Sequence, residues 1–200
     1  MHHLLCKAGE LAWKTHTATL KLLDKKGYSY FGVYDGESVA KYCGNNLHTR
    51  IAKDAQFETN LVAAIQNGFL GTDDDLKNDS QFQNDSSGCA AVMAIVTPNN
   101  EIYVGNAGNS RAVLSEDGIA CQMSDDHKPI NPGESKRIQD AGGFVEFGKV
   151  NAYPDVKMTE TKFEATEFLI LACDGIWDCL SSQDVVSFIR KNISENKDLR

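Results

Sequence analysis

The sequence lacks the features that mark nucleic-acid binders and membrane proteins. It has no cluster of Lys and Arg, and its net charge is −8 at pH 7, which argues against a nucleic-acid backbone as partner. No apolar run approaches the roughly 20 residues that a membrane-spanning helix needs. The N-terminus has no basic-then-apolar signal. We therefore expect an intracellular protein, cytoplasmic or nuclear, with no nucleic-acid or membrane partner.

The sequence also lacks paired cysteines and long linkers. The six cysteines form no CxxC pair and have no spacing typical of a disulfide framework, so we interpret them as buried thiols in a reducing compartment. A chain of 200 residues buries roughly 70% of its unfolded surface, which is enough to fold without disulfides or metal. We expect one domain, residues 1–200, and a monomer.

Hydrophobic periodicity predicts a mixed α and β chain. Apolar residues at helical spacing predict two helices after an aromatic-rich strand, and a third helix near the end, capped by Ser181 or Ser182. Three strands in the middle, with tight turns at Asn99-Asn100 and Asp117-Gly118, predict a β-meander. A short helix is expected to begin near Pro132 and to end at Gly142-Gly143. The expected segments are helices Val39–Ala52, Glu58–Phe69 and 181–193, strands Tyr30–Tyr34, Cys89–Val96, Glu101–Gly108, Arg111–Ala120 and Leu169–Cys173, and a polar surface loop Asp73–Ser87.

Two of the predicted strands end in the same dipeptide. Apolar Leu169–Cys173, a pattern typical of a strand covered on both faces, is followed by Asp174 and a glycine. The aromatic strand is followed by Asp35 and Gly36. Asp-Gly is a common turn, so one interpretation is simply two turns. The other is a pair of carboxylates for a hard divalent cation, because such ions take oxygen ligands completed by water.

The order of five motifs resembles the type 2C metal-dependent serine/threonine protein phosphatases. The motifs are FGVYDG, SSGCAAVMAIV, YVGNAGNSRAVL, DDHKPINPGESKRIQDAGGFV and LACDGIWDCLSSQDVV, and they cover nearly all of the chain from about Trp13. The resemblance implies an α+β fold of two stacked antiparallel β-sheets flanked by helices. It also implies a site at one end of this β-sandwich.

The resemblance assigns roles to three residues at that site. Asp35 would bridge two manganese or magnesium ions, Gly36 would offer its carbonyl to one ion, and Asp174 would bind on the other side. Such a pair of ions activates a bridging water and neutralises phosphoryl oxygens. The implied activity is hydrolysis of phosphoserine or phosphothreonine in a phosphorylated protein substrate.

The sequence departs from the family pattern at the same end of the fold. Lys14 stands where the family has an arginine on the substrate phosphate, and the acidic pair that follows is absent. Glu37 follows Asp-Gly where the family has the histidine that protonates the leaving group. Asn109 replaces an aspartate tied to a third metal. The family's S-R-x-x-G-D stretch is missing between Val150 and Tyr153, and the sequence stops at Arg200 before the D-N-M/V-T segment.

Two explanations of these departures stay open. The protein is a degenerate phosphatase that binds a partner such as a kinase or phosphoprotein, or the sequence lacks residues of site loops from an active enzyme, which we favour. As printed, the chain is expected to have little or no activity. Missing segments or short connections are expected at Lys14–Thr15, Gly36–Glu37 and Val150–Ala152.

Several other side chains are given ordinary structural roles. We interpret His127, in DDHKP, as a turn histidine and not as a general acid, because no carboxylate partner is visible in the sequence. Trp177 and Phe188 are expected in the core.

Overall fold

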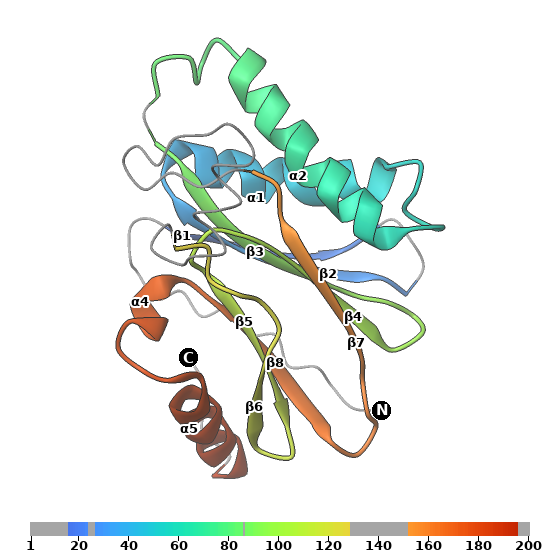
Figure 1. Ribbon diagram of the computed structural model, residues 1–200, viewed down its shortest axis with the longest axis vertical. Coiled ribbons are helices and arrows are strands. Elements are labelled where there is room, and N and C mark those ends of the chain that lie inside the picture. Colours follow the sequence, from blue (N-terminus) through green and yellow to red (C-terminus); the bar gives the residue numbers. More distant parts are fainter. Residues whose placement is uncertain (1–15, 24–26, 86, 129–151, 196–200) are drawn as a thin grey trace.

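The computed structural model describes residues 16–23, 27–85, 87–128 and 152–195, and these ranges form an α+β sandwich (Figure 1). Lys14 and the helix expected near Pro132 lie outside the described residues. The strands are β1 His16–Leu22, β2 Ser29–Gly36, β3 Cys89–Val96, β4 Glu101–Ala107, β5 Arg111–Glu116, β6 Ile119–Gln122, β7 Asp155–Glu160 and β8 Thr166–Ala172. The helices are α1 Ser38–Lys53, α2 Leu61–Asn78, α4 Asp174–Trp177 and α5 Ser182–Ser194.

The strands form two antiparallel sheets. One has five strands in the order β1-β2-β3-β4-β7, and the other has three in the order β6-β5-β8. Helices α1 and α2 cover the outer face of the five-stranded sheet, and α5 lies against the three-stranded sheet (Figure 1). This arrangement confirms the expected fold class of stacked antiparallel sheets flanked by helices.

Three apolar clusters hold the layers together. The first packs α1 and α2 on the five-stranded sheet, and includes the fully buried Tyr30 and Tyr34. The second lies between the two sheets, where Val92 and Val104 meet Leu114. The third joins α5 and Trp177 to the three-stranded sheet. Trp177 is therefore a core residue, as predicted. In the part of the chain described here, no helix is both long and apolar enough to span a bilayer.

The predicted meander is wrong, because its strands belong to different sheets. β3 pairs with β4 in one sheet, whereas β5 pairs with β6 in the other. The chain crosses between sheets at Gly108, whose φ of +126° suits glycine. The two expected tight turns are present, with positive φ at Asn100, Asp117 and Gly118. Strands β1 and β7 were not predicted.

The predicted surface loop begins too early, because α2 continues to Asn78. Its polar last turns are stabilised by pairing: Asp75 forms an ion pair with Arg50 of α1, and Lys77 pairs with Asp73 one turn away. Leu76 also packs against the core below. Tertiary contacts therefore override the polar composition from which the loop was predicted.

Helix α5 agrees with the prediction at its start and differs on its apolar face. The Ser181 hydroxyl accepts a hydrogen bond from the Asp184 N–H, which confirms it as the N-cap. Val185 and Val186 are buried, but Phe188 is 64% exposed and Ile193 is 43% exposed. Placing Phe188 in the core was wrong, because the narrow three-stranded sheet does not cover the whole apolar stripe.

Strand β8 lies at one side of the three-stranded sheet and packs on both faces, as predicted, although Phe168–Leu171 are only half-buried. Leu169 and Leu171 pack between the sheets, and Phe168 and Ile170 pack toward α5. The cysteines only partly follow the prediction. All five in the described ranges are free thiols, of which Cys43 and Cys173 are buried, Cys89 and Cys121 are half-buried, and Cys179 is exposed.

Candidate metal centre

Asp35 lies at the end of β2, where the backbone is paired on both sides. Its Cα partners are His16 on β1 and Ala90 on β3. Side chains alternate along a strand, so Asp35 lies on the same face as Val33, which packs in the core between the sheets. The half-buried Asp35 carboxylate is therefore directed toward the three-stranded sheet at one end of the sandwich.

Gly36 ends β2 in a conformation that only glycine adopts easily. Its φ is +141°, and a Cβ at this position would lie 2.2 Å from the carbonyl oxygen of Gly88. Helix α1 begins at Ser38, so Glu37 alone connects strand and helix, and its side chain makes no capping hydrogen bond. This is the short connection expected from the missing histidine.

Asp174 is the first residue of α4, directly after the Cys173 N-cap. The prediction placed Asp174 at a rigid strand end, but β8 ends two residues earlier, at Ala172. A side chain from elsewhere orients it instead: Asn109 Nδ2 donates a hydrogen bond of 2.6 Å to Asp174 Oδ2. Asn109 therefore contacts one oxygen of the carboxylate and leaves the other side of the group for a further ligand.

The two carboxylates approach the same thiol. Burial is the main cause that raises the pKa of Cys173 to about 12, and the negative charges of Asp35 and Asp174 contribute to the same increase. Leu169 and Leu171 of β8 pack in the layer between the sheets, and the buried Cys173 follows directly after the end of this strand. The structure thus brings the ends of β2 and β8 toward one place, although 139 positions separate Asp35 from Asp174 (174 − 35).

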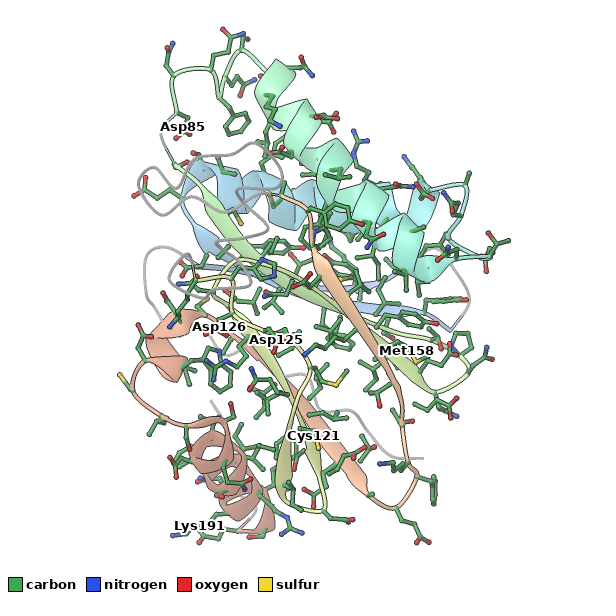
Figure 2. The ribbon with its side chains drawn as sticks, in the orientation of Figure 1. Asp85, Cys121, Asp125, Asp126, Met158 and Lys191 are labelled. Carbon is green, nitrogen blue, oxygen red and sulfur yellow. The ribbon has the colours of Figure 1, made fainter. Side chains whose placement is uncertain are left out.

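Helix α4 is braced by Arg111, at the start of β5. The guanidinium donates two hydrogen bonds of 2.8 Å to Asp126 and one of 3.2 Å to the Ser182 hydroxyl. It also lies 5.2 Å from the ring centroid of Trp177, a distance typical of cation–π contact. Figure 2 shows Asp126 close to α4. Arg111 therefore links α4, through Trp177, to Asp126 and to the first residue of α5.

His127 has a carboxylate partner that sequence reasoning missed. The residue is only 4% exposed, and its Nε2 lies 2.8 Å from Asp155 Oδ2. The prediction of a turn residue without such a pair was wrong on this point, because Asp155 is brought in by β7, a strand that was not predicted. No local sequence signal joins positions 127 and 155.

The donors at this end suit a hard cation with few protein ligands. Asp35, the Gly36 carbonyl and Asp174 provide oxygen atoms of the kind that Mg²⁺ and Mn²⁺ take, with water completing the shell. Throughout the described ranges, no three His, Cys, Asp or Glu side chains are grouped as a metal site. A centre here would therefore rest on two carboxylates, and metal binding by these residues stays a prediction.

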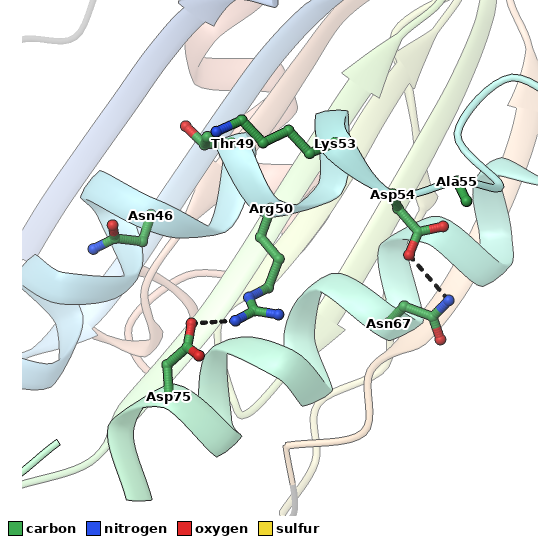
Figure 3. Close-up of a pocket in the computed structure, with 8 residues that line it drawn as sticks. All are labelled: Asn46, Thr49, Arg50, Lys53, Asp54, Ala55, Asn67 and Asp75. Atoms are coloured by element: carbon green, nitrogen blue, oxygen red, sulfur yellow. Dashed lines mark hydrogen bonds and ion pairs between the residues drawn. The ribbon is translucent and has the colours of Figure 1, made fainter. Parts of the chain in front are cut away.

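Two cavities lie near helix α1, and one of them adjoins the candidate centre. The first, about 550 Å³, lies between α1 and α2, where Arg50 pairs with Asp75 and Asn67 donates to Asp54 (Figure 3). Its charged groups largely satisfy one another. The second, about 570 Å³, is lined in part by Asn109 and so adjoins the candidate centre.

A family of known proteins matches nearly the whole sequence. The model of the protein phosphatase 2C family matches residues 7–153 and 149–200. The two matches meet where the family's S-R-x-x-G-D stretch is absent from this sequence. Protein phosphatase 2C homolog 2 of Aspergillus fumigatus is 40% identical over 206 aligned positions, covering 87% of this chain and 48% of the relative. Since 87% of 200 residues is about 174, at least some 30 aligned positions (206 − 174 = 32) have no residue here.

Further relatives and a solved structure agree with this match. Protein phosphatase 2C homolog 2 of Schizosaccharomyces pombe is 40% identical, covering 92% of this chain and 59% of its own length. The chain thus spans about half the length of these relatives. The crystal structure of a serine-threonine phosphatase 2C from Toxoplasma gondii has the same fold, with a TM-score of 0.77, 16% identity, and coverage of 93% of this chain and 81% of that one. On this evidence, the chain belongs to the protein phosphatase 2C family.

Proposed function

We propose that this chain carries the metal centre of a serine/threonine protein phosphatase, which hydrolyses phosphoserine and phosphothreonine in proteins with manganese or magnesium. The observation that carries the proposal is the placement of the two residues beside the layer between the sheets: Asp35 ends β2 on the face of Val33, and Asp174 follows β8, whose Leu171 packs in the same layer. Membership of the family supplies the reaction class. The phosphorylated protein substrate follows from that class.

Each residue at the centre would have a separate task. Asp35, fixed by pairing with β1 and β3, would hold the cations between the sheets. The Gly36 carbonyl would add a neutral oxygen, and Asp174 would bind from the side of α4. Divalent ions, when bound, lower the pKa of a coordinated water and neutralise phosphoryl charge. Lys14 would meet the phosphate as a point charge, without the two-pronged geometry of arginine.

A second candidate function is a catalytically impaired module that binds a kinase or phosphoprotein through the same face. Two observations favour it. Glu37 follows Asp35-Gly36 where the family has its proton-donating histidine. The Asn109 amide already occupies one oxygen of Asp174.

Phosphate release from a phosphothreonine peptide separates these functions. With manganese, the chain is expected to release phosphate slowly, and Asp35→Asn should lower the rate about 100-fold or more, since even outer-shell partners of metals are worth 10–100-fold. Asp178→Asn is the matched control, because Asp178 is an exposed carboxylate at the far end of α4. No release, with peptide binding retained, supports the binding module and contradicts the phosphatase.

A further inference from the structure

The turn that carries Asn109 is fixed by buried hydrogen bonds. Asn106 is fully buried, and its Nδ2 donates to the carbonyl of Gly108 at 3.1 Å and to that of Asp125 at 3.0 Å. Gly108 has a φ of +126°, and a Cβ there would lie 2.6 Å from the Ala90 side chain. The Gly108–Asn109 turn is thus pressed against β3 and tied to the segment that leads to His127.

His127 forms hydrogen bonds to the same turn through both its backbone and its side chain. Its backbone N–H donates to the Gly108 carbonyl at 2.9 Å, and its Nδ1 accepts from the Gly108 N–H at 3.4 Å. Because Nδ1 accepts, the ring proton is on Nε2, which donates to Asp155 Oδ2 at 2.8 Å. Asp155 begins β7 and is the Cα partner of Asn106 on β4. The imidazole therefore connects the turn to the end of the five-stranded sheet.

The position of the Gly108–Asn109 turn affects the candidate centre through the Asn109 side chain. Asn109 directly follows Gly108, and its amide donates to Asp174 Oδ2 at 2.6 Å. Moving Gly108 would move the donor that orients the Asp174 carboxylate. A hydrogen bond to a metal ligand from a residue that does not itself bind the metal sets the direction of that ligand, and it is sensitive to displacements well under 1 Å.

We propose that His127 is a positioning residue, which fixes the Asp174 carboxylate through the Gly108–Asn109 turn. The proposal rests on the proposed function in taking Asp174 as a metal ligand. It assigns His127 no contact with substrate or metal. Asp155 acts one step further out, because it holds the ring in the tautomer that accepts from Gly108.

The first test needs no metal, and uses the NMR signal of the Asn109 side-chain amide, which is identified by its loss in Asn109→Ala. In His127→Ala, this signal is expected to move toward the position of a solvent-exposed amide. His48→Ala is the matched control, because His48 is a half-buried histidine on α1, away from the turn. An unchanged Asn109 signal in His127→Ala overturns the proposal.

Conservative variants separate positioning from simple loss of packing, and remain informative where the alanine variant does not fold. Asparagine places an oxygen near the position of Nδ1, whereas glutamine places an amide nitrogen near that of Nε2. His127→Asn is therefore expected to keep the wild-type Asn109 signal, and His127→Gln to lose it despite keeping a donor for Asp155. The reverse order contradicts the proposed route through Gly108.

The second test measures manganese binding by calorimetry beside the melting temperature. His127→Ala is expected to weaken manganese binding about tenfold or more, as outer-shell changes do, and His127→Asn to restore most of it. A lower melting temperature with unchanged manganese affinity shows a purely structural histidine and overturns the proposal. If the wild type binds no manganese, the proposed function fails, and the Asn109 signal alone still decides the role of His127.

Discussion

Asp-Gly occurs at the end of β2 and again two residues after the end of β8, and the two pairs are held in different ways. Asp35-Gly36 is part of a strand paired on both sides, and Gly88 leaves no room for a side chain on Gly36. Asp174-Gly175 starts a short helix, and a Cβ on Gly175 would meet no atom within 4 Å. The first carboxylate is therefore placed by the backbone of its strand. The second is oriented by the Asn109 side chain, on a short helix that Arg111 contacts through Trp177.

The largest expected loss of stability comes from a substitution in Asp35-Gly36, the pair that the backbone holds. Gly36→Ala combines a positive φ with a contact of 2.2 Å to Gly88, so we expect the free energy of unfolding to fall by about 3 kcal/mol or more. Gly175→Ala should change it by no more than about 0.5 kcal/mol. Urea denaturation of both variants provides the comparison. Equal losses would show that the two Asp-Gly pairs do not differ as described.

The next largest loss of stability is expected from a substitution beside Asp174-Gly175, the pair that side chains hold. Arg111→Met keeps part of the aliphatic volume but removes the ion pair to Asp126, which is only 9% exposed, and the contact with Trp177. The Asp126 carboxylate would keep its longer ion pair with Lys128, at 3.7 Å, but would lose both hydrogen bonds from the guanidinium, which is expected to cost about 2–3 kcal/mol, below the range for fully buried pairs. Asp126→Asn in the same background should recover part of the loss. Wild-type stability in Arg111→Met would mean that α4 needs no brace.

Asn109→Asp is expected to have a smaller and metal-dependent effect. A carboxylate would replace the amide that now lies 2.6 Å from Asp174, so repulsion should lower stability without metal by about 1 kcal/mol. Manganese should reverse this loss and bind more tightly than to the wild type, because one more oxygen ligand is present. Thermal melting with and without manganese checks both. A loss that manganese does not reverse contradicts a cation site at Asp174.

The smallest change in stability is expected at Glu167, which is outside both Asp-Gly pairs and therefore gives a reference for the other variants. Burial raises the pKa of Glu167, but hydrogen bonds from Ser115 and Arg190 outweigh it, so the pKa is lowered overall. A lowered pKa stabilises the fold at neutral pH, and this contribution is lost as the pH falls below the ordinary glutamate range. Glu167→Gln should lower stability at pH 7 by less than about 1 kcal/mol and flatten the acid limb of the pH profile. A steeper acid limb in the variant would contradict this sign.

Local patterns predicted most of the strands and helices because each depends on short-range periodicity. The β3 strand has the predicted bounds, and α1 extends the prediction by one residue at each end. The division of strands between two sheets was missed, since nothing local distinguishes a hairpin from a crossing at Gly108. The end of α2 was missed because Asp75 is paired by a residue 25 positions away.

The candidate site also has a part that the sequence revealed and a part that only the fold brings together. Asp35 and Asp174 could be found from the sequence because each interrupts an apolar strand. The Asn109 contact and the His127–Asp155 pair could not, because they join residues 65 and 28 positions apart through the fold. Their residue types alone fit many surface roles.

Calorimetric titration with manganese tests the central claim, that Asp35 and Asp174 form one cation site. We expect weak but measurable binding by the wild type, since few protein ligands are present. Asp35→Ala and Asp174→Ala should each abolish it, while the melting temperature of Asp174→Ala stays close to that of the wild type, because the Asp174 side chain is not part of an apolar cluster. Manganese binding by both variants equal to that of the wild type would contradict the claim and leave Asp174 as the first residue of a short helix.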